Sequence, residues 1–388
     1  MSIRKKKLIL VVVTARSSYT KFKTVLKNIN KSSLLELKLI CSGSAILDRF
    51  GDLESIIRKD NLEISEKIYF TLEQEKPINS AKSTSLAIAE FSNCFNRFNP
   101  DLVMIMADRY EVIGPAIAAA YLNIPLAHVQ GGEISGNIDE KVRHAITKLA
   151  DLHFPATKQS YQNIIQMGED KNCVFFTGCP SIDIAKRSIK KKLHFYDRYQ
   201  GVGYKQNLNK KFAILMFHSD TYDYSKSGVY MTRILDSLHE LKLPTIVFWP
   251  NQDVGGDLIS KSIRKFREKY KSKYFYFIKN ISPDDFLNLL NKANLIIGNS
   301  SAGIRESSYL GTLAINIGKR QEGRERDLNI IDIPPMKKAI KESIKNNLNL
   351  KFEKSLKYGN GEAGKKIVKI LENERFKNKK RFNQIKFY

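Results

Sequence analysis

Residues 107–154 read ADRYEVIGPAIAAAYLNIPLAHVQGGEISGNIDEKVRHAITKLADLHF, and the fold can be worked out from this stretch. An apolar run at 102–106 leads into it, and an alanine-rich segment separates that run from a second one at 125–129. Short apolar runs of this kind are typical of buried strands, and the segment between them is typical of a helix. The stretch therefore predicts a strand–helix–strand unit of a parallel sheet.

Polar and glycine residues gather where the second predicted strand ends: His128, Gln130, Gly131, Gly132 and Glu133. The first turns of the next predicted helix add three more: Asp139, Arg143 and His144. Ligands of open α/β sheets bind at such strand ends. Paired glycines beside a helix start let backbone N–H groups approach an anion, and carboxylates with imidazoles supply acid–base chemistry. This loop is therefore the first candidate site.

Each of these residues also has a structural explanation. A histidine such as His128 is commonly a hydrogen-bonded core residue, and an acid such as Asp139 commonly caps a helix. The whole set at the end of one predicted strand favours a functional site over separate structural roles.

The rest of the chain continues the alternation of strands and helices. In the first part, strands are predicted at 8–13, 35–41, 68–70 and 174–177, with helices at 21–30, 46–58, 83–98 and up to 167. In the second part, strands are predicted at 212–217, 245–248, 274–278, 295–297 and 314–317, with helices at 229–241, 257–270, from 283, and 304–310. The sequence thus predicts an α/β protein with two doubly wound, Rossmann-like domains.

The domain boundaries follow from where this alternation stops. A chain of 388 residues exceeds what one hydrophobic core usually supports. We expect a first domain at 1–183, a basic connection without apolar period at 184–211, a second domain at 212–360, and a C-terminal helix with a basic tail at 361–388.

The chain carries a net charge of +25, which raises the alternative of a basic nucleic-acid-binding protein. The lysines are spread over the whole chain, and no zinc-finger, helix-turn-helix or RNA-binding pattern accompanies them. A basic surface also attracts an anionic small molecule such as a sugar nucleotide. We therefore expect no nucleic-acid partner.

The spacing of the cysteines and the lengths of the apolar runs indicate the cellular compartment of the protein. The four cysteines form no CxxC pair and no zinc-finger spacing, which predicts a reduced cytoplasmic protein without a structural metal. The run at 8–13 is too short for a secretory signal, and no run approaches the ~20 residues of a membrane span. We expect no membrane partner.

Four motifs, ordered along the chain, carry a family resemblance. They are ADRYE (Ala107–Glu111), HVQGGEISGNIDEKVRHAITKLADLHF (His128–Phe154), GNSSAGIRESSYLGT (Gly298–Thr312) and GKRQEGRER (Gly318–Arg326). Together they resemble the signature of the hydrolysing UDP-N-acetylglucosamine 2-epimerases of bacterial sialic and legionaminic acid pathways and of the bifunctional animal enzyme.

The resemblance implies a glycosyltransferase-B fold, in which two Rossmann-like domains face a cleft and the C-terminal helix packs back on the first domain. It implies elimination of a nucleoside diphosphate to a glycal, followed by addition of water, which releases a free manno-configured sugar. The implied donor is UDP-N-acetylglucosamine or a UDP- or GDP-linked 2,4-diacetamido-2,4,6-trideoxyglucose, used for nonulosonic acid synthesis. It also implies a homodimer or homotetramer without cofactor or metal.

Two alternatives share this fold. A non-hydrolysing UDP-N-acetylglucosamine 2-epimerase would return a nucleotide sugar, and a retaining glycosyltransferase would glycosylate an acceptor. The run GGEISGNIDEKVRHAITK (131–148) favours the hydrolysing branch by resemblance.

The resemblance also assigns site residues. The acid–base carboxylates are Asp108, Glu133 and Asp139. Residues that orient the sugar or stabilise the departing phosphates are Arg143, His144 and His218. Further substrate contacts in the first domain are Arg16, Tyr19, Gln130, Gly131 and Gly132. Those in the second domain are Asn251, Asp253, Ser300, Ser301, Gly303, Glu306 and Arg320.

The residue types predicted to contact substrate in the second domain suit the parts of a nucleotide. Hydroxyl groups and a glycine at a helix start suit a diphosphate, although a simple helix cap explains Ser300 and Ser301 as well. Glu306 offers an acceptor for ribose hydroxyls, and Arg320 a cation for the phosphates.

Two positions depart from the family pattern. Many relatives have a carboxylate where Gln130 stands, which shifts the acid–base role to Glu133 and Asp139. Relatives also often have an acid before the tyrosine near the N-terminus, where this chain has Ser18 before Tyr19. The second change predicts a different hexose, such as the diacetamido sugar.

Overall fold

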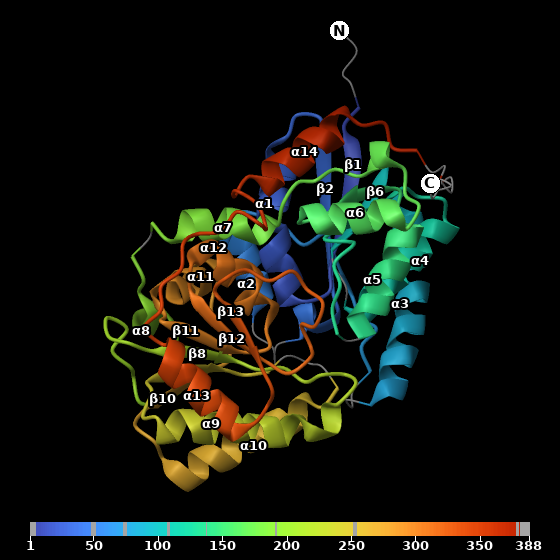
Figure 1. Cartoon of the computed structure of the whole chain (residues 1–388). Helices are drawn as coiled ribbons and strands as arrows, with labels where there is room; N and C mark the ends of the chain where they lie inside the picture. Colours follow the sequence, from blue (N-terminus) through green and yellow to red (C-terminus); the bar gives the residue numbers. More distant parts are fainter. Residues whose placement is uncertain are drawn as a thin grey trace, which may run out of the picture. The chain divides into compact units, whose positions relative to one another are not determined.

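The structure is a computed structural model that describes residues 5–47, 52–72, 76–106, 109–136, 138–190, 192–250, 254–377 and 380. It has two compact units (Figure 1). Unit 1 comprises 1–134, 138–183 and 358–388, and unit 2 comprises 184–357 together with Ser135 and Gly136. The class is confirmed as α/β with two units, each built on a largely parallel sheet.

Unit 1 contains a sheet of six parallel strands. In spatial order they are β3 (Glu66–Ile68), β2 (Leu35–Ser42), β1 (Lys7–Val13), β4 (Leu102–Met106), β5 (Leu126–Val129) and β6 (Leu152–Phe154). The strand order reverses between β1 and β4, as in dinucleotide-binding folds. The carboxyl ends of β1, β4 and β5 therefore lie side by side at one edge.

Helices cover both faces of this sheet. The helices of unit 1 are α1 (Arg16–Lys31), α2 (Leu53–Lys59), α3 (Pro77–Phe98), α4 (Ile113–Tyr121), α5 (Ile138–Leu149), α6 (Lys158–Gln166) and α14 (Ala363–Asn373). The single turns among the described residues of unit 1 are η1 (Gly43–Ile46), η3 (Tyr110–Val112) and η4 (Lys171–Cys173). One core packs Phe22 of α1 and Leu371 of α14 against the sheet, and the other packs Phe91 of α3.

Unit 2 contains a seven-stranded sheet. In order the strands are β13 (Ile330–Ile333), β12 (Leu313–Ile317), β11 (Leu295–Gly298), β8 (Ala213–Met216), β9 (Thr245–Phe248), β10 (Phe275–Ile278) and β7 (Val202–Gly203). Among the described strands of this sheet, β7 runs antiparallel to β10 and the others pair in parallel. The other elements are α8 (Phe195–Arg198), η5 (Tyr224–Lys226), α9 (Ser227–Glu240), α10 (Gly256–Tyr270), α11 (Pro283–Lys292), η6 (Ser301–Gly303), α12 (Arg305–Leu310) and α13 (Lys337–Asn347). Helix α7 (Pro180–Ser188) begins in unit 1 and ends in unit 2.

Two sequence expectations are wrong. The predicted strand at 174–177 is absent among the described residues, where Val174 makes a single bridge to His153. The strand that pairs with β5 is instead β6, which is three residues long and has a histidine in its middle. The segment 184–211 is more than a connection, because β7 joins the second sheet and Phe195 packs on Tyr276.

In the described part of the chain, none of the helices is long and apolar enough to cross a bilayer.

Helix α14 is attached to unit 1 through the carboxylate of Asp183. That buried carboxylate accepts hydrogen bonds from the backbone N–H groups of Ala363 at 2.9 Å and Gly364 at 2.7 Å, and from the Thr24 hydroxyl at 2.9 Å. A negative charge at a helix N-terminus satisfies donors that have no partner within the helix and complements the helix dipole. A Cβ on Gly364 would lie 2.6 Å from Thr24 Oγ1, so this close approach requires glycine.

We expect Asp183→Ala to lower the free energy of unfolding by about 2–4 kcal/mol, because it removes a charged acceptor and leaves two buried N–H groups unsatisfied. The measurement is urea unfolding followed by circular dichroism. Glu362→Ala is the matched control, since Glu362 precedes the same helix but makes no side-chain cap. Equal losses in the two variants would contradict this role of Asp183.

Candidate functional site

The chain turns sharply after β5, and packing accounts for the residues at the turn. Gln130 has φ +65° and Gly132 has φ +76°. A Cβ on Gly132 would lie 2.3 Å from the carbonyl oxygen of Ser160 in α6, and one on Gly131 would lie 2.8 Å from His128 Nδ1. The two glycines therefore allow the loop to pass close to α6 and to the ring of His128.

Gln130 is fully buried, and its side-chain amide donates to Cys179 Sγ at 2.8 Å. This side chain lies inside unit 1, where it connects the turn to the residue before α7. The sequence placed Gln130 among the substrate contacts, but the structure gives it a structural partner.

Arg143 joins the loop to helix α5. Its guanidinium is fully buried and donates to the backbone carbonyl of Glu133. One turn later, the Thr147 hydroxyl donates to the Arg143 carbonyl at 3.0 Å and lies 3.2 Å from His128 Nδ1. Strand β5, the loop with Glu133 and helix α5 are thus linked by buried hydrogen bonds, which holds Glu133 close to α5.

Asp139 and His144 lie on α5 and are half-buried. His144 Nε2 lies 3.6 Å from Glu140 Oε1. Burial lowers the pKa of the His144 imidazole, the positive charge of Arg143 lowers it further, and Glu140 opposes both. His144 is therefore a neutral imidazole at pH 7, able to donate one hydrogen bond and accept another.

Two other predicted residues of unit 1, Tyr19 and Arg16, lie on α1, the helix that follows β1. Tyr19 is fully buried in the core, and its hydroxyl donates to Asp60 at 2.7 Å. Arg16 is the first residue of α1 and is half-buried. Beyond β4, Arg109 pairs with the buried Glu111 at 2.6 Å. Asp108 lies outside the described residues, so its position stays a prediction.

In unit 2, Asn299 ties together the ends of β8 and β11. Its Oδ1 accepts from the His218 N–H at 2.7 Å, and its Nδ2 donates to the His218 carbonyl at 2.8 Å. Gly298 has φ +135°, and a Cβ there would lie 1.9 Å from the Met216 carbonyl oxygen. The start of the GNSS motif therefore fixes the backbone of His218, which is itself buried.

The loop after β12 is attached to the same asparagine. The side chains of Arg320 and Gln321 donate to the Asn299 carbonyl at 3.2 and 2.9 Å. Ser300 caps η6 by accepting from the Ala302 N–H at 3.3 Å, and Ser301 follows it, half-buried. The two motifs of the second unit thus converge within hydrogen-bonding distance of one residue.

Four further residues of unit 2 were predicted to contact the substrate, and the structure describes two of them. Glu306 is nearly buried on α12. A Cβ on Gly303 would make only ordinary contacts, the nearest at 3.8 Å, so packing does not require glycine there. Asn251 and Asp253 lie outside the described residues.

Three polar residues in this part of unit 2 were absent from the predicted set: Asn299, Gln321 and Asp220. Burial raises the pKa of Asp220, although the Tyr222 N–H and the charge of Arg320 oppose it. The polar run 218–220 at the end of a predicted strand was the available signal for Asp220. The pairing of Asn299 with His218 depends on the adjacency of two strands, which the sequence does not show. Within the described ranges, no three His, Cys, Asp or Glu side chains gather as a metal site.

Comparisons with known proteins agree on one family. The family model described as UDP-N-acetylglucosamine 2-epimerase matches residues 27–372. A UDP-N,N'-diacetylbacillosamine 2-epimerase (hydrolyzing) of Legionella pneumophila is 31% identical over 94% of this chain and 95% of its own. A GDP/UDP-N,N'-diacetylbacillosamine 2-epimerase (hydrolyzing) of Campylobacter jejuni is 32% identical over 84% of each chain.

A solved structure supports the fold. The UDP-GlcNAc 2-epimerase of Neisseria meningitidis bound to UDP-GlcNAc has a TM-score of 0.77 at 18% identity, over 95% of this chain and all of that one. The fold is accordingly of the glycosyltransferase-B type, as expected from the sequence.

We expect the pKa of His144 to lie below 6.5 in an NMR titration of protein with labelled histidine, because burial and Arg143 both disfavour the imidazolium. His144→Gln assigns the resonance. Glu140→Gln should lower the pKa further, since it removes a carboxylate that opposes these effects. A pKa at or above the usual value would contradict the neutral form.

Proposed function

Because the chain belongs to the UDP-N-acetylglucosamine 2-epimerase family, we propose that it is a hydrolysing nucleotide-sugar 2-epimerase. The products are a free manno-configured 2-acetamido sugar and a nucleoside diphosphate. The observation that carries this proposal is the likeness to two relatives named as hydrolysing enzymes, each above 30% identity over most of the chain.

The donor we favour is a UDP- or GDP-linked 2,4-diacetamido-2,4,6-trideoxyglucose, with UDP-N-acetylglucosamine as the simpler candidate. The names of those same two relatives support the diacetamido sugar. The replacement of an acid by Ser18 fits a changed sugar contact. A polysialic acid biosynthesis protein of Escherichia coli, 30% identical, supports a role in making a nonulosonic acid.

The proposed reaction has two steps, and the carboxylates of unit 1 move the protons. In the first, a carboxylate takes the C2 proton, the C1–oxygen bond to the diphosphate breaks, and a C1–C2 double bond forms. In the second, water adds its oxygen to C1 while a proton is delivered to C2 on the opposite face. Glu133 and Asp139, together with Asp108, are the groups proposed for these transfers.

The remaining polar groups bind and neutralise the leaving group. In the proposal, the hydroxyls of Ser300 and Ser301 and the guanidinium of Arg320 bind the diphosphate, whose charge grows as the C1–oxygen bond breaks. The neutral imidazole of His144 and the buried His218 side chain orient the sugar by hydrogen bonds. We further infer a cytoplasmic homodimer or homotetramer, and the four free cysteines fit a reducing compartment.

The test is a proton NMR time course in D2O with four donors: UDP- and GDP-linked N-acetylglucosamine and the UDP- and GDP-linked diacetamido sugar. The expected result is a free manno-configured sugar with deuterium at C2, together with nucleoside diphosphate. A manno-configured sugar still linked to its nucleotide would establish the non-hydrolysing reaction instead. Failure to consume any donor would refute the proposed activity.

We expect Glu133→Gln and Asp139→Asn each to lower kcat by about 10²–10⁴-fold with a small change in KM, because the amides cannot transfer the C2 proton. The assay follows release of nucleoside diphosphate from the best donor. Glu36→Gln, at an exposed carboxylate of β2, is the control and should retain full activity. A fall in kcat below tenfold for both site variants would remove them from the mechanism.

We expect Ser301→Ala to weaken UDP binding by about tenfold, because it removes a hydroxyl donor to a charged group. Ser301 is preferred to Ser300, which also caps η6. Calorimetric titration with UDP measures the change, and Ser85→Ala on the exposed face of α3 is the matched control. Unchanged affinity in Ser301→Ala would remove Ser301 from the proposed diphosphate ligands.

A further inference from the structure

An ionic cluster around one buried carboxylate lies at the C-terminal end of α5, the helix whose N-terminal half carries the proposed acid–base residues. Its centre is Glu169, which is only 5% exposed. The Glu169 carboxylate meets Lys148 Nζ at 2.6 Å, Lys380 Nζ at 2.8 Å and His153 Nε2 at 3.3 Å. Lys380, which is far away in the sequence, therefore meets the end of α5 and strand β6 at one carboxylate.

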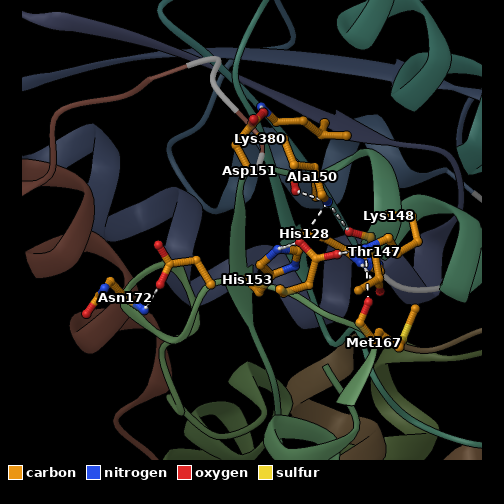
Figure 2. Close-up of polar contacts among 12 residues, drawn as sticks. His128, Thr147, Lys148, Ala150, Asp151, His153, Met167, Asn172 and Lys380 are labelled. Carbon is orange, nitrogen blue, oxygen red and sulfur yellow. Dashed lines mark hydrogen bonds and ion pairs between the residues drawn. The ribbon is translucent and has the colours of Figure 1, made fainter. Parts of the chain in front are cut away.

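Lys380 also binds the end of helix α5 directly. Its ammonium donates to the backbone carbonyls of Thr147 at 2.9 Å and Ala150 at 2.7 Å, contacts that can be followed in Figure 2. Carbonyl groups in the last turn of a helix have no partner within the helix, and a cation there also complements the helix dipole. Lys380 thus attaches the C-terminal segment to the end of α5.

The Glu169 carboxylate is ionised at neutral pH. Burial by itself would raise the pKa of Glu169, but hydrogen bonds from His153, Lys148 and Lys380 outweigh burial and lower the pKa to about 2. A buried carboxylate that stays ionised needs its cations, because removing one partner leaves charge poorly compensated. Loss of Lys380 would therefore disturb both Glu169 and the helix end.

One residue connects this cluster to the proposed site. The Thr147 carbonyl accepts from Lys380, while the Thr147 hydroxyl bonds to the Arg143 carbonyl and lies beside His128. Arg143 in turn holds the Glu133 carbonyl. Packed helices move as rigid elements, so a shift at the end of α5 is transmitted to its first turns, and a displacement of ~1 Å at reacting groups can cost ~10²-fold in rate.

We propose that Lys380, held by Glu169, is a positioning residue that fixes α5 along its axis and thereby places Asp139, Arg143 and Glu133 for the reaction. This inference rests on the proposed function. Lys380 touches neither the proton-transferring groups nor the proposed diphosphate ligands in any contact described above, so its effect should appear in kcat and leave UDP binding unchanged.

The experiment compares full-length Lys380→Met, Lys380→Arg and Glu169→Gln with Lys365→Met, which removes an exposed lysine of α14. We expect Lys380→Met and Glu169→Gln to lower kcat by about tenfold or more, with KM and UDP affinity within about twofold. Lys380→Arg, which keeps the charge, should recover most of kcat. Lys365→Met should have the same kcat, KM and UDP affinity as the unmodified protein.

Hydrogen–deuterium exchange supplies a second measurement that does not depend on turnover. The backbone amide hydrogens of 139–147 should exchange faster in Lys380→Met than in the unmodified protein. If kcat and exchange in α5 are both unchanged at a temperature where the variant is folded, Lys380 is not a positioning residue, whatever its effect on thermal stability. If the unmodified protein turns over no donor, the proposed function fails, and the exchange result alone decides whether Lys380 fixes α5. Should Lys380→Met fail to fold, Glu169→Gln and Lys380→Arg provide the same comparison.

Discussion

A buried arginine is the interaction on which the arrangement of unit 1 depends. Arg143 has no exposed surface, and it donates to the carbonyl of the loop that carries Glu133. Burying a guanidinium costs several kcal/mol unless hydrogen bonds satisfy it. The loop and the first turns of α5 are therefore constrained to the conformation that provides those bonds. Burial lowers the pKa of His144 and the charge of Arg143 lowers it further, so one residue fixes a backbone position and also favours the neutral imidazole beside it.

In unit 2, a neutral side chain rather than a buried charge fixes the backbone near the proposed site. Asn299 forms a pair of hydrogen bonds with the backbone of His218 and accepts two more at its carbonyl from the following loop. A side-chain amide can imitate a backbone peptide, since it offers one acceptor and donors in the same plane. This joins two neighbouring strand ends and one loop at modest energetic cost.

The parts of the fold that the sequence predicted are those with local signals. Strands such as 8–13 and 295–297 are continuous apolar runs, and the structure contains them as β1 and β11. The failures concern contacts between distant segments. β6 is too short to stand out, and its partner bridge at Val174 was mistaken for a strand. The hydrogen bond from the Tyr19 hydroxyl to Asp60 is likewise a contact between distant residues that the sequence does not show, while the predicted contact of Tyr19 with substrate stays a prediction.

The attachment of α14 to Asp183 has a consequence for how the chain is made. Unit 1 begins at the N-terminus but includes a helix that is synthesised only after all of unit 2. Until α14 emerges from the ribosome, Phe22 and its neighbours on α1 lack part of their cover, and at ~5–20 residues per second this interval lasts on the order of ten seconds or more. The domain that starts first is completed last, so the nascent chain must keep an apolar surface from aggregating while an entire second domain folds.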